Sequence, residues 1–165
     1  MFQGLTHPWF VRSCTTLMLI PVLACSTQVQ QPPDPLVGTW TLNIQRSKFR
    51  PGLPPKSMTV TYEQTPKGLH ATSVVVLRDG TSSRNEYTAA YDGKDYPITG
   101  VAKVDTVSVR QIDTLTSERI DKRGGERVQS YLRQVYADGR TMIVTQKGAD
   151  AMGSLVDHMM IFEKK

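Results

Sequence analysis

Turn-forming dipeptides that end in glycine recur at short intervals along this chain, and their spacing limits the possible folds more than any other feature. They are Lys67-Gly68, Asp79-Gly80, Asp92-Gly93, Gly124-Gly125, Asp138-Gly139 and Lys147-Gly148. The segments between them are rich in valine, threonine, tyrosine and isoleucine, which favour strands. Short strands separated by such dipeptides predict an antiparallel all-β fold.

Period-two alternation supports this interpretation. Met58, Val60 and Tyr62 fall on one strand face and the polar residues between them on the other. Helix is expected to be minor. We predict strands over 36–44, 57–65, 69–78, 82–91, 95–99, 104–112, 115–122, 126–136, 140–147 and 155–163.

Sequential strands joined by short hairpins leave two exposed sheet edges unless the sheet closes. Closure removes both edges, so we predict an antiparallel up-and-down β-barrel of about 8–10 strands. A two-sheet sandwich is the alternative, and it is disfavoured because every connection reads as a hairpin rather than a long crossover.

Residues 1–24 have the pattern of an export signal. Arg12 is their one cation, they contain no acid, and an apolar stretch follows over 16–24. This stretch ends at Val22-Leu23-Ala24-Cys25, which resembles the lipobox of bacterial lipoproteins. The resemblance implies that the signal is removed and that Cys25 is lipidated, and a plain secretory signal is the alternative.

The polar and proline-rich residues 25–35 are predicted to be a flexible tether, with the folded domain over 36–165. Ser26, an uncharged residue directly after the cysteine, resembles the sorting signal of outer-membrane lipoproteins. We therefore expect an outer-membrane lipoprotein of the cell envelope that faces the periplasm and is held to the membrane by its lipid anchor. The formal net charge is +5, which by itself would suggest nucleic acid. Export excludes nucleic acid as a partner.

The predicted domain opens with Leu36-Val37-Gly38-Thr39-Trp40-Thr41-Leu42 and ends with Met160-Ile161-Phe162-Glu163-Lys164. The first segment resembles the opening strand of lipocalins and fatty-acid-binding proteins, and the second resembles the last strand of fatty-acid-binding proteins. In layout, the domain resembles the lipocalin-like (calycin) barrels of bacterial lipoproteins. The resemblance implies that Trp40 lies inside, at the closed end of the barrel.

The departures from that family concern the ligand. Fatty-acid-binding proteins hold a carboxylate with an arginine and a tyrosine on the last strand, where this chain has Met160 and Phe162. Arg133 resembles a second interior arginine of the family, but the turn after it is one residue longer. It is therefore either a ligand anchor or a solvated outward residue, and the outward position is the commoner one for a barrel arginine.

The helical lid of that family is absent. Prolines and a glycine in the segment 46–55 exclude two helices, so an irregular arm should cross one barrel end, with Phe49 and Leu53 packing down. The candidate ligand-binding residues are thus Trp40, Phe49, Arg133, Met160 and Phe162.

Signals for catalysis are weak. His70 and His158 lie far apart in the sequence, and no His/Cys cluster or G-x-S-x-G motif occurs. Asp92 and Asp95 could be imagined as calcium ligands, but Asp92-Gly93 reads as an ordinary turn. We expect no metal, no cofactor and no enzymatic activity.

Two functions remain. One is binding of a small apolar or amphipathic ligand inside the barrel of a monomer. The other is a structural or interaction module of the cell envelope with a packed core, including a possible inhibitor role. Inward-facing small residues would favour the first, and bulky methionine, valine and tyrosine side chains would favour the second. The small residues in question are Ala71, Ser73, Ser108 and Ser117.

Overall fold

The computed structural model describes residues 33–149 and 153–165. The predicted export signal, Cys25 and most of the predicted tether lie outside these residues. The described residues belong to one compact unit. The ten strands that close the barrel all lie between Gly38 and Lys164 of this unit.

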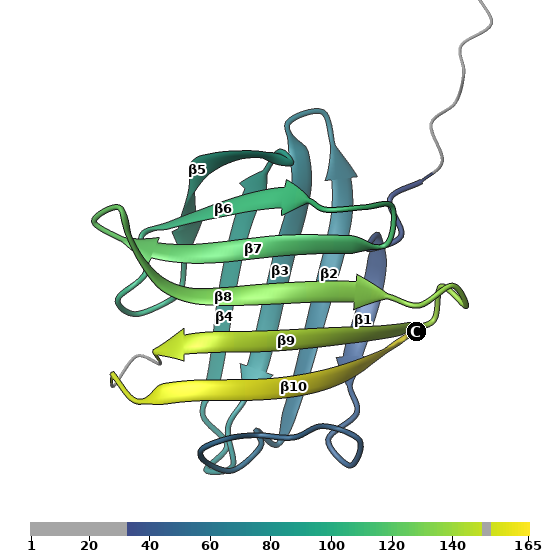
Figure 1. Ribbon diagram of the computed structural model, residues 1–165. Helices are drawn as coiled ribbons and strands as arrows, with labels where there is room; N and C mark the ends of the chain where they lie inside the picture. The colour runs from purple at the N-terminus through teal and green to yellow at the C-terminus, as the bar shows by residue number, and fades with distance from the viewer. Residues whose placement is uncertain (1–32, 150–152) are drawn as a thin grey trace, which may run out of the picture. The chain divides into compact units, whose positions relative to one another are not determined.

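Ten antiparallel strands close into a barrel in which each strand pairs with its sequence neighbours and the last pairs with the first (Figure 1). The strands are β1 Gly38–Leu42, β2 Ser57–Thr65, β3 Gly68–Val76, β4 Ser82–Ala89, β5 Asp92–Thr99, β6 Thr106–Gln111, β7 Thr116–Arg123, β8 Glu126–Val135, β9 Thr141–Ala149 and β10 Leu155–Lys164. Each predicted segment overlaps one observed strand, and β3, β5, β7, β9 and β10 extend beyond the predicted bounds by one to three residues. The predicted all-β barrel is confirmed, and the sandwich alternative is wrong.

The barrel wall is not uniform. β9 and β10 pair along their whole length, from Ala149–Leu155 to Thr141–Glu163. In contrast, β4 and β5 pair only through Glu86–Thr99 and Tyr87–Ile98. Few ladder hydrogen bonds therefore join this part of the wall, and we call it the β4–β5 seam.

The arm (residues 45–56) extends the pairing of β1 along β10 before it turns away. Backbone hydrogen bonds join Lys48 and Met159 in both directions, at 2.7 and 2.8 Å, and the Asp157 amide donates to the Arg50 carbonyl at 2.7 Å. Phe49 packs against the core as expected. The expectation for Leu53 is wrong, because its side chain is 74% exposed at the tip of the arm.

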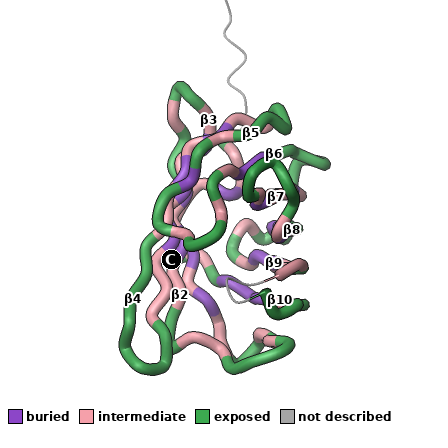
Figure 2. The backbone as a smooth tube through the Cα atoms, turned by 90° about the vertical axis from the view of Figure 1, so that its left-hand side faces the viewer, coloured by how far each residue is buried: buried purple, intermediate pink, exposed green. Residues whose placement is uncertain are grey.

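The start of the domain closes one end of the barrel. Trp40 is fully buried, and its indole nitrogen donates to the Leu36 carbonyl at 2.7 Å. The Lys164 ammonium lies 5.0 Å from the centre of the indole ring. Buried and less buried positions alternate along β3 and the first half of β9, so one face of these strands builds the interior, whereas β6 and β10 each have three consecutive buried residues. Figure 2 shows the burial along the backbone.

Candidate ligand-binding site

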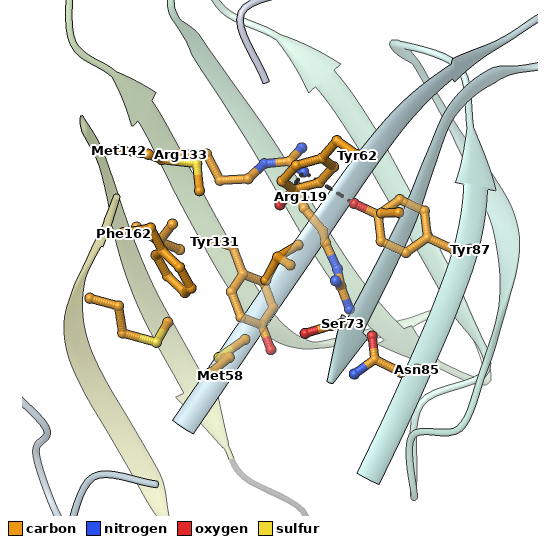
Figure 3. Close-up of a pocket in the computed structure, with 14 residues that line it drawn as sticks. Met58, Tyr62, Ser73, Asn85, Tyr87, Arg119, Tyr131, Arg133, Met142 and Phe162 are labelled. Atoms are coloured by element: carbon orange, nitrogen blue, oxygen red, sulfur yellow. Dashed lines mark hydrogen bonds between the residues drawn. The ribbon is translucent and has the colours of Figure 1, made fainter. Parts of the chain in front are cut away.

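A cavity of about 50 Å³ lies inside the barrel, and its walls differ in chemistry (Figure 3). The wall from β2, β9 and β10 is apolar except for Tyr62 of β2, and the wall from β3, β4, β7 and β8 is mostly polar. The apolar wall is Met58, Val60, Met142, Val144, Met160 and Phe162; the other lining residues are Tyr62, Ala71, Ser73, Asn85, Tyr87, Arg119, Tyr131 and Arg133.

Arg133 is the principal charged group of this cavity. Arg133 is 2% exposed, and its Nη1 donates to the hydroxyl oxygens of Tyr87 at 3.1 Å and Tyr62 at 3.5 Å. Its Nε and Nη2 atoms are buried without a hydrogen-bond partner in the structure. No carboxylate within the described residues forms an ion pair with it.

The Arg133 guanidinium remains charged in this setting. Burial lowers its pKa, but the phenol oxygens of Tyr87 and Tyr62 more than offset that effect, and the pKa lies above its ordinary value. Burial raises the pKa of the Tyr62 hydroxyl, so this phenol is a neutral partner of Arg133. A buried charge without a counter-charge costs several kcal/mol. The cavity therefore favours an anion beside Arg133.

Arg119 provides the contrast. Its Nε and Nη2 donate to the two carboxylate oxygens of Asp121 at 2.5 and 2.8 Å. Its guanidinium also lies 4.8 Å from the ring centre of Tyr87 and 4.9 Å from that of Tyr131. Burial lowers the pKa of Arg119, and the Asp121 carboxylate more than reverses this. Asp121 neutralises Arg119, so the interior keeps the net positive charge of Arg133.

A wider hollow of about 340 Å³ lies at the arm end of the barrel. We call it the mouth hollow. Its outer wall includes Phe49, Leu53 and Leu77, and it shares Met58, Asn85, Tyr131 and Met160 with the inner cavity. Because these four residues belong to both linings, the two spaces adjoin.

Tyr131, one of the residues that line both spaces, is held by hydrogen bonds. Its hydroxyl donates to the Gln129 side-chain oxygen at 2.5 Å and accepts from the Gln146 amide at 3.3 Å. An inner space of this size holds a few waters or a small polar headgroup. The mouth hollow has the volume of a small-ligand pocket.

The structure brings most of the predicted site residues together. Arg133, Met160 and Phe162 line the inner cavity, and Phe49 lines the mouth hollow. Trp40 lines neither space, because it is packed at the closed end. The prediction that Arg133 more commonly points outward is wrong. Arg133 is buried and lies between the exposed Leu132 and Gln134, so it shares the inward face of β8 with Tyr131 and Val135.

The small residues divide between the two faces. Ala71 and Ser73 line the inner cavity, where their size leaves room. Ser117 is buried on the strand face that also carries Arg119 and Asp121. Ser108, in contrast, lies between the inward Val107 and Val109, so it belongs to the outer face of β6.

The polar wall of the inner cavity was not predicted from the sequence. Ser117, Arg119 and Asp121 alternate along one strand, and that period-two signal was available. Charge on a strand face normally indicates solvent. The signal that this face points inward is tertiary, because Arg119 pairs opposite the interior Tyr131.

The two histidines within the described residues have structural roles. His70 contacts the Thr88 and Thr72 hydroxyls at 2.9 and 3.4 Å, and His158 accepts from the Arg50 amide at 3.0 Å. Within the described residues, no group of three or more His, Cys, Asp or Glu side chains is placed to hold a metal ion. None of the described segments is a helix of the length and apolarity that a membrane span requires.

Comparison with known proteins gives a likeness in fold. No family model matches the chain, and no curated protein matches it. Among solved structures, the chain is similar to zebrafish ileal bile acid-binding protein complexed with cholic acid, with a TM-score of 0.46 and 11% identity over 79% of this chain and 99% of that one. The fold assignment rests on the strand pairing itself: the chain is an all-β, ten-stranded antiparallel closed barrel with a buried, unpaired arginine in its cavity.

Proposed function

We propose that the barrel binds one small amphipathic ligand whose anionic group contacts Arg133. The observation that carries this proposal is the buried guanidinium with two unsatisfied N–H donors beside a cavity. A carboxylate fits these donors because it can accept two parallel hydrogen bonds from one guanidinium. The proposed role is binding and involves no catalysis.

The apolar part of the ligand would extend from the inner cavity into the mouth hollow. Met58 and Met160 line both spaces and supply a flexible, polarisable surface along that route. Tyr131 also lines both spaces, so its side chain would contact a ligand that occupies both. We therefore expect a ligand with a compact charged end and a larger apolar body.

The first test compares dodecanoate with dodecanol on the 26–165 chain by isothermal titration calorimetry. We expect dodecanoate to bind more tightly. Arg133→Met should weaken dodecanoate binding roughly tenfold to a hundredfold, the size of a lost charge-assisted hydrogen bond, and leave dodecanol binding nearly unchanged. Arg110→Met is the matched control, because it removes an exposed arginine on the outer face of the barrel.

A second readout checks that the variant folds. Replacing an unpaired buried charge with an apolar side chain is often neutral or stabilising. Arg133→Met should therefore equal or exceed the wild type in resistance to urea without ligand. If both proteins fold and bind dodecanoate equally well, Arg133 is not the anion site.

The alternative is a structural or interaction module of the envelope, including an inhibitor role. It is favoured by the small size of the inner cavity, because tyrosine and methionine side chains fill most of the barrel. Native mass spectrometry of the purified 26–165 chain distinguishes the two functions. A stoichiometric amphiphile supports ligand binding, and a bare mass together with no dodecanoate binding supports the packed module.

We also propose that the barrel is an envelope protein held to a membrane through lipidated Cys25 and facing the periplasm. The support is the lipobox-like sequence Val22-Leu23-Ala24-Cys25 together with the apolar leader before it. In a bacterial host, Cys25→Ala should move the protein out of the membrane fraction without changing its thermal unfolding. Retention of the variant in the membrane fraction would contradict the lipid anchor.

A further inference from the structure

The arm carries an unusual concentration of positive charge. Residues 45–56 contain four cations, Arg46, Lys48, Arg50 and Lys56, and no acid. Arg46 pairs with Glu163 at 3.0 Å. The other three are exposed, and none of them forms an ion pair with a carboxylate in the described part of the chain.

Two exposed leucines lie beside these cations. Leu53, at the tip of the arm, is 74% exposed, and Leu77, in the β3–β4 turn, is 46% exposed. Both line the mouth hollow, as does the exposed Arg78 next to Leu77. One cation, Arg78, and both leucines therefore line the same opening, and Lys48, Arg50 and Lys56 lie on the arm that supplies part of its lining.

The arm is held in place by the barrel. Its Lys48 and Arg50 backbones bond to Met159 and Asp157 of β10, and the rings of Phe49 and His158 are 5.1 Å apart. Three prolines restrict the remainder of the segment. A partner that contacts this surface therefore meets a preformed element, seen at the lower edge of Figure 1 between β1 and β2.

We propose that this end of the barrel docks on an anionic lipid bilayer through Lys48, Arg50, Lys56 and Arg78, with Leu53 and Leu77 entering the interface. An anionic membrane attracts each basic residue near its surface by about 1 kcal/mol, which corresponds to about fivefold in partitioning. Apolar side chains add to this by burial among the lipid headgroups. A soluble polyanion would use the cations but gain nothing from the leucines, so the combination favours a membrane.

The consequence is that the mouth hollow opens at the bilayer surface, where amphipathic molecules are concentrated. The inference goes beyond ligand binding and does not depend on it, because the docking surface stands on exposed residues that are separate from Arg133. It also differs from the proposed lipid anchor, which is a covalent attachment at Cys25.

Vesicle co-sedimentation tests the proposal. The 26–165 chain, which lacks the leader and Cys25, is mixed with vesicles of equal phosphatidylglycerol and phosphatidylcholine or of phosphatidylcholine alone. We expect binding to the anionic vesicles only, and weaker binding as salt is added. The triple variant Lys48→Gln/Arg50→Gln/Lys56→Gln should reduce partitioning about a hundredfold.

A charge-matched variant controls for net charge. Lys67→Gln/Arg140→Gln/Lys165→Gln removes three exposed cations from the opposite end of the barrel, where Lys67 lies one strand length, roughly 30 Å, from the arm. It should reduce partitioning much less than the arm variant. Equal loss in the two triple variants would overturn the proposal, because it would show attraction by net charge alone.

Leu53→Ser separates a membrane from a soluble polyanion. We expect it to weaken vesicle binding several-fold and to leave binding to polyphosphate unchanged. If vesicle binding is insensitive to Leu53→Ser and the wild type binds polyphosphate equally well, the arm is a polyanion site instead. Dodecanoate binding without vesicles should be equal in the wild type and the arm variant, so the docking surface and the ligand site can fail independently.

Discussion

At the residue scale, two arginines on neighbouring strands show how a partner decides the role of a buried charge. Arg119 has a carboxylate on its own strand, and Arg133 has two phenols. The first is a neutralised pair that holds Tyr87 and Tyr131 in place by ring contacts. The second leaves donors that a bound acceptor can satisfy, and an anion would also neutralise the charge.

Loss of the Asp121 carboxylate should be costly. Asp121 is 1% exposed, so Asp121→Ala leaves Arg119 as a second unpaired charge in the interior. We expect the free energy of unfolding to fall by about 3–5 kcal/mol, measured by urea denaturation. The double variant Arg119→Met/Asp121→Leu should recover most of this loss. A double variant as unstable as the single one would show that the pair matters for its shape and not for its charge.

Among the elements, β4 and β5 form the least paired part of the barrel wall, the β4–β5 seam. One glycine allows the turn after β5 to approach the backbone of β4. Gly100 follows β5 with a φ of +78°, and a Cβ atom there would lie 1.9 Å from the Arg84 carbonyl oxygen. The turn after β5 thus rests directly on the backbone of β4. A side chain at this position would separate the two strands.

Gly100→Ala should therefore open the seam. Gly80→Ala is the matched control, because Gly80 has a similar φ of +89° but nothing within 4 Å of the added Cβ. Both variants bear the backbone strain of a positive φ, and only Gly100→Ala adds the clash. We expect much faster hydrogen exchange in β4 and β5 for Gly100→Ala than for Gly80→Ala. Similar exchange in the two variants would show that the contact with β4 does not hold the seam.

At the scale of the whole molecule, one turn motif is repeated around the barrel. An aspartate side chain accepts the backbone N–H two residues later at Asp79, Asp92, Asp113 and Asp138, with distances of 2.8–3.1 Å. In each case this hydrogen bond is the main cause that lowers the aspartate pKa below its ordinary value of 3.8. The hairpins thus share a common dependence on ionised aspartate.

This repetition predicts acid sensitivity. Because the folded-state pKa values are lowered, the unfolded chain binds more protons in acid, so stability is complete above about pH 5 and is lost as the pH falls through the folded-state values. Urea denaturation at pH 7 and pH 3 measures the loss. Asparagine forms the same turn without titrating, so changing all four aspartates to asparagine should make the loss smaller. An unchanged pH dependence in that variant would assign it to other groups.

The positions of the ten strand segments, their antiparallel order and closure into a barrel could be predicted from the sequence. These depend on local properties: turn dipeptides, β-propensity and period-two alternation act over a few residues, and short hairpins then leave one simple way to remove the sheet edges. The inward position of Trp40 follows from the same alternation. The sequence also indicated four ligand-binding candidates that line the cavity or the mouth hollow, but not which residues surround them: Phe49, Arg133, Met160 and Phe162.

Which polar residues face the interior could not be predicted from the sequence, because it depends on contacts between distant strands. Arg119 and Asp121 look like solvated residues in the sequence. The rings of Tyr87 and Tyr131 that contact Arg119 lie on other strands, and only the closed barrel brings them to this ion pair. The same holds for Arg133, whose phenol partners come from β2 and β4, far away in the chain. The free energy of burying a charge depends on neighbours in space, and those neighbours exist only after the barrel closes.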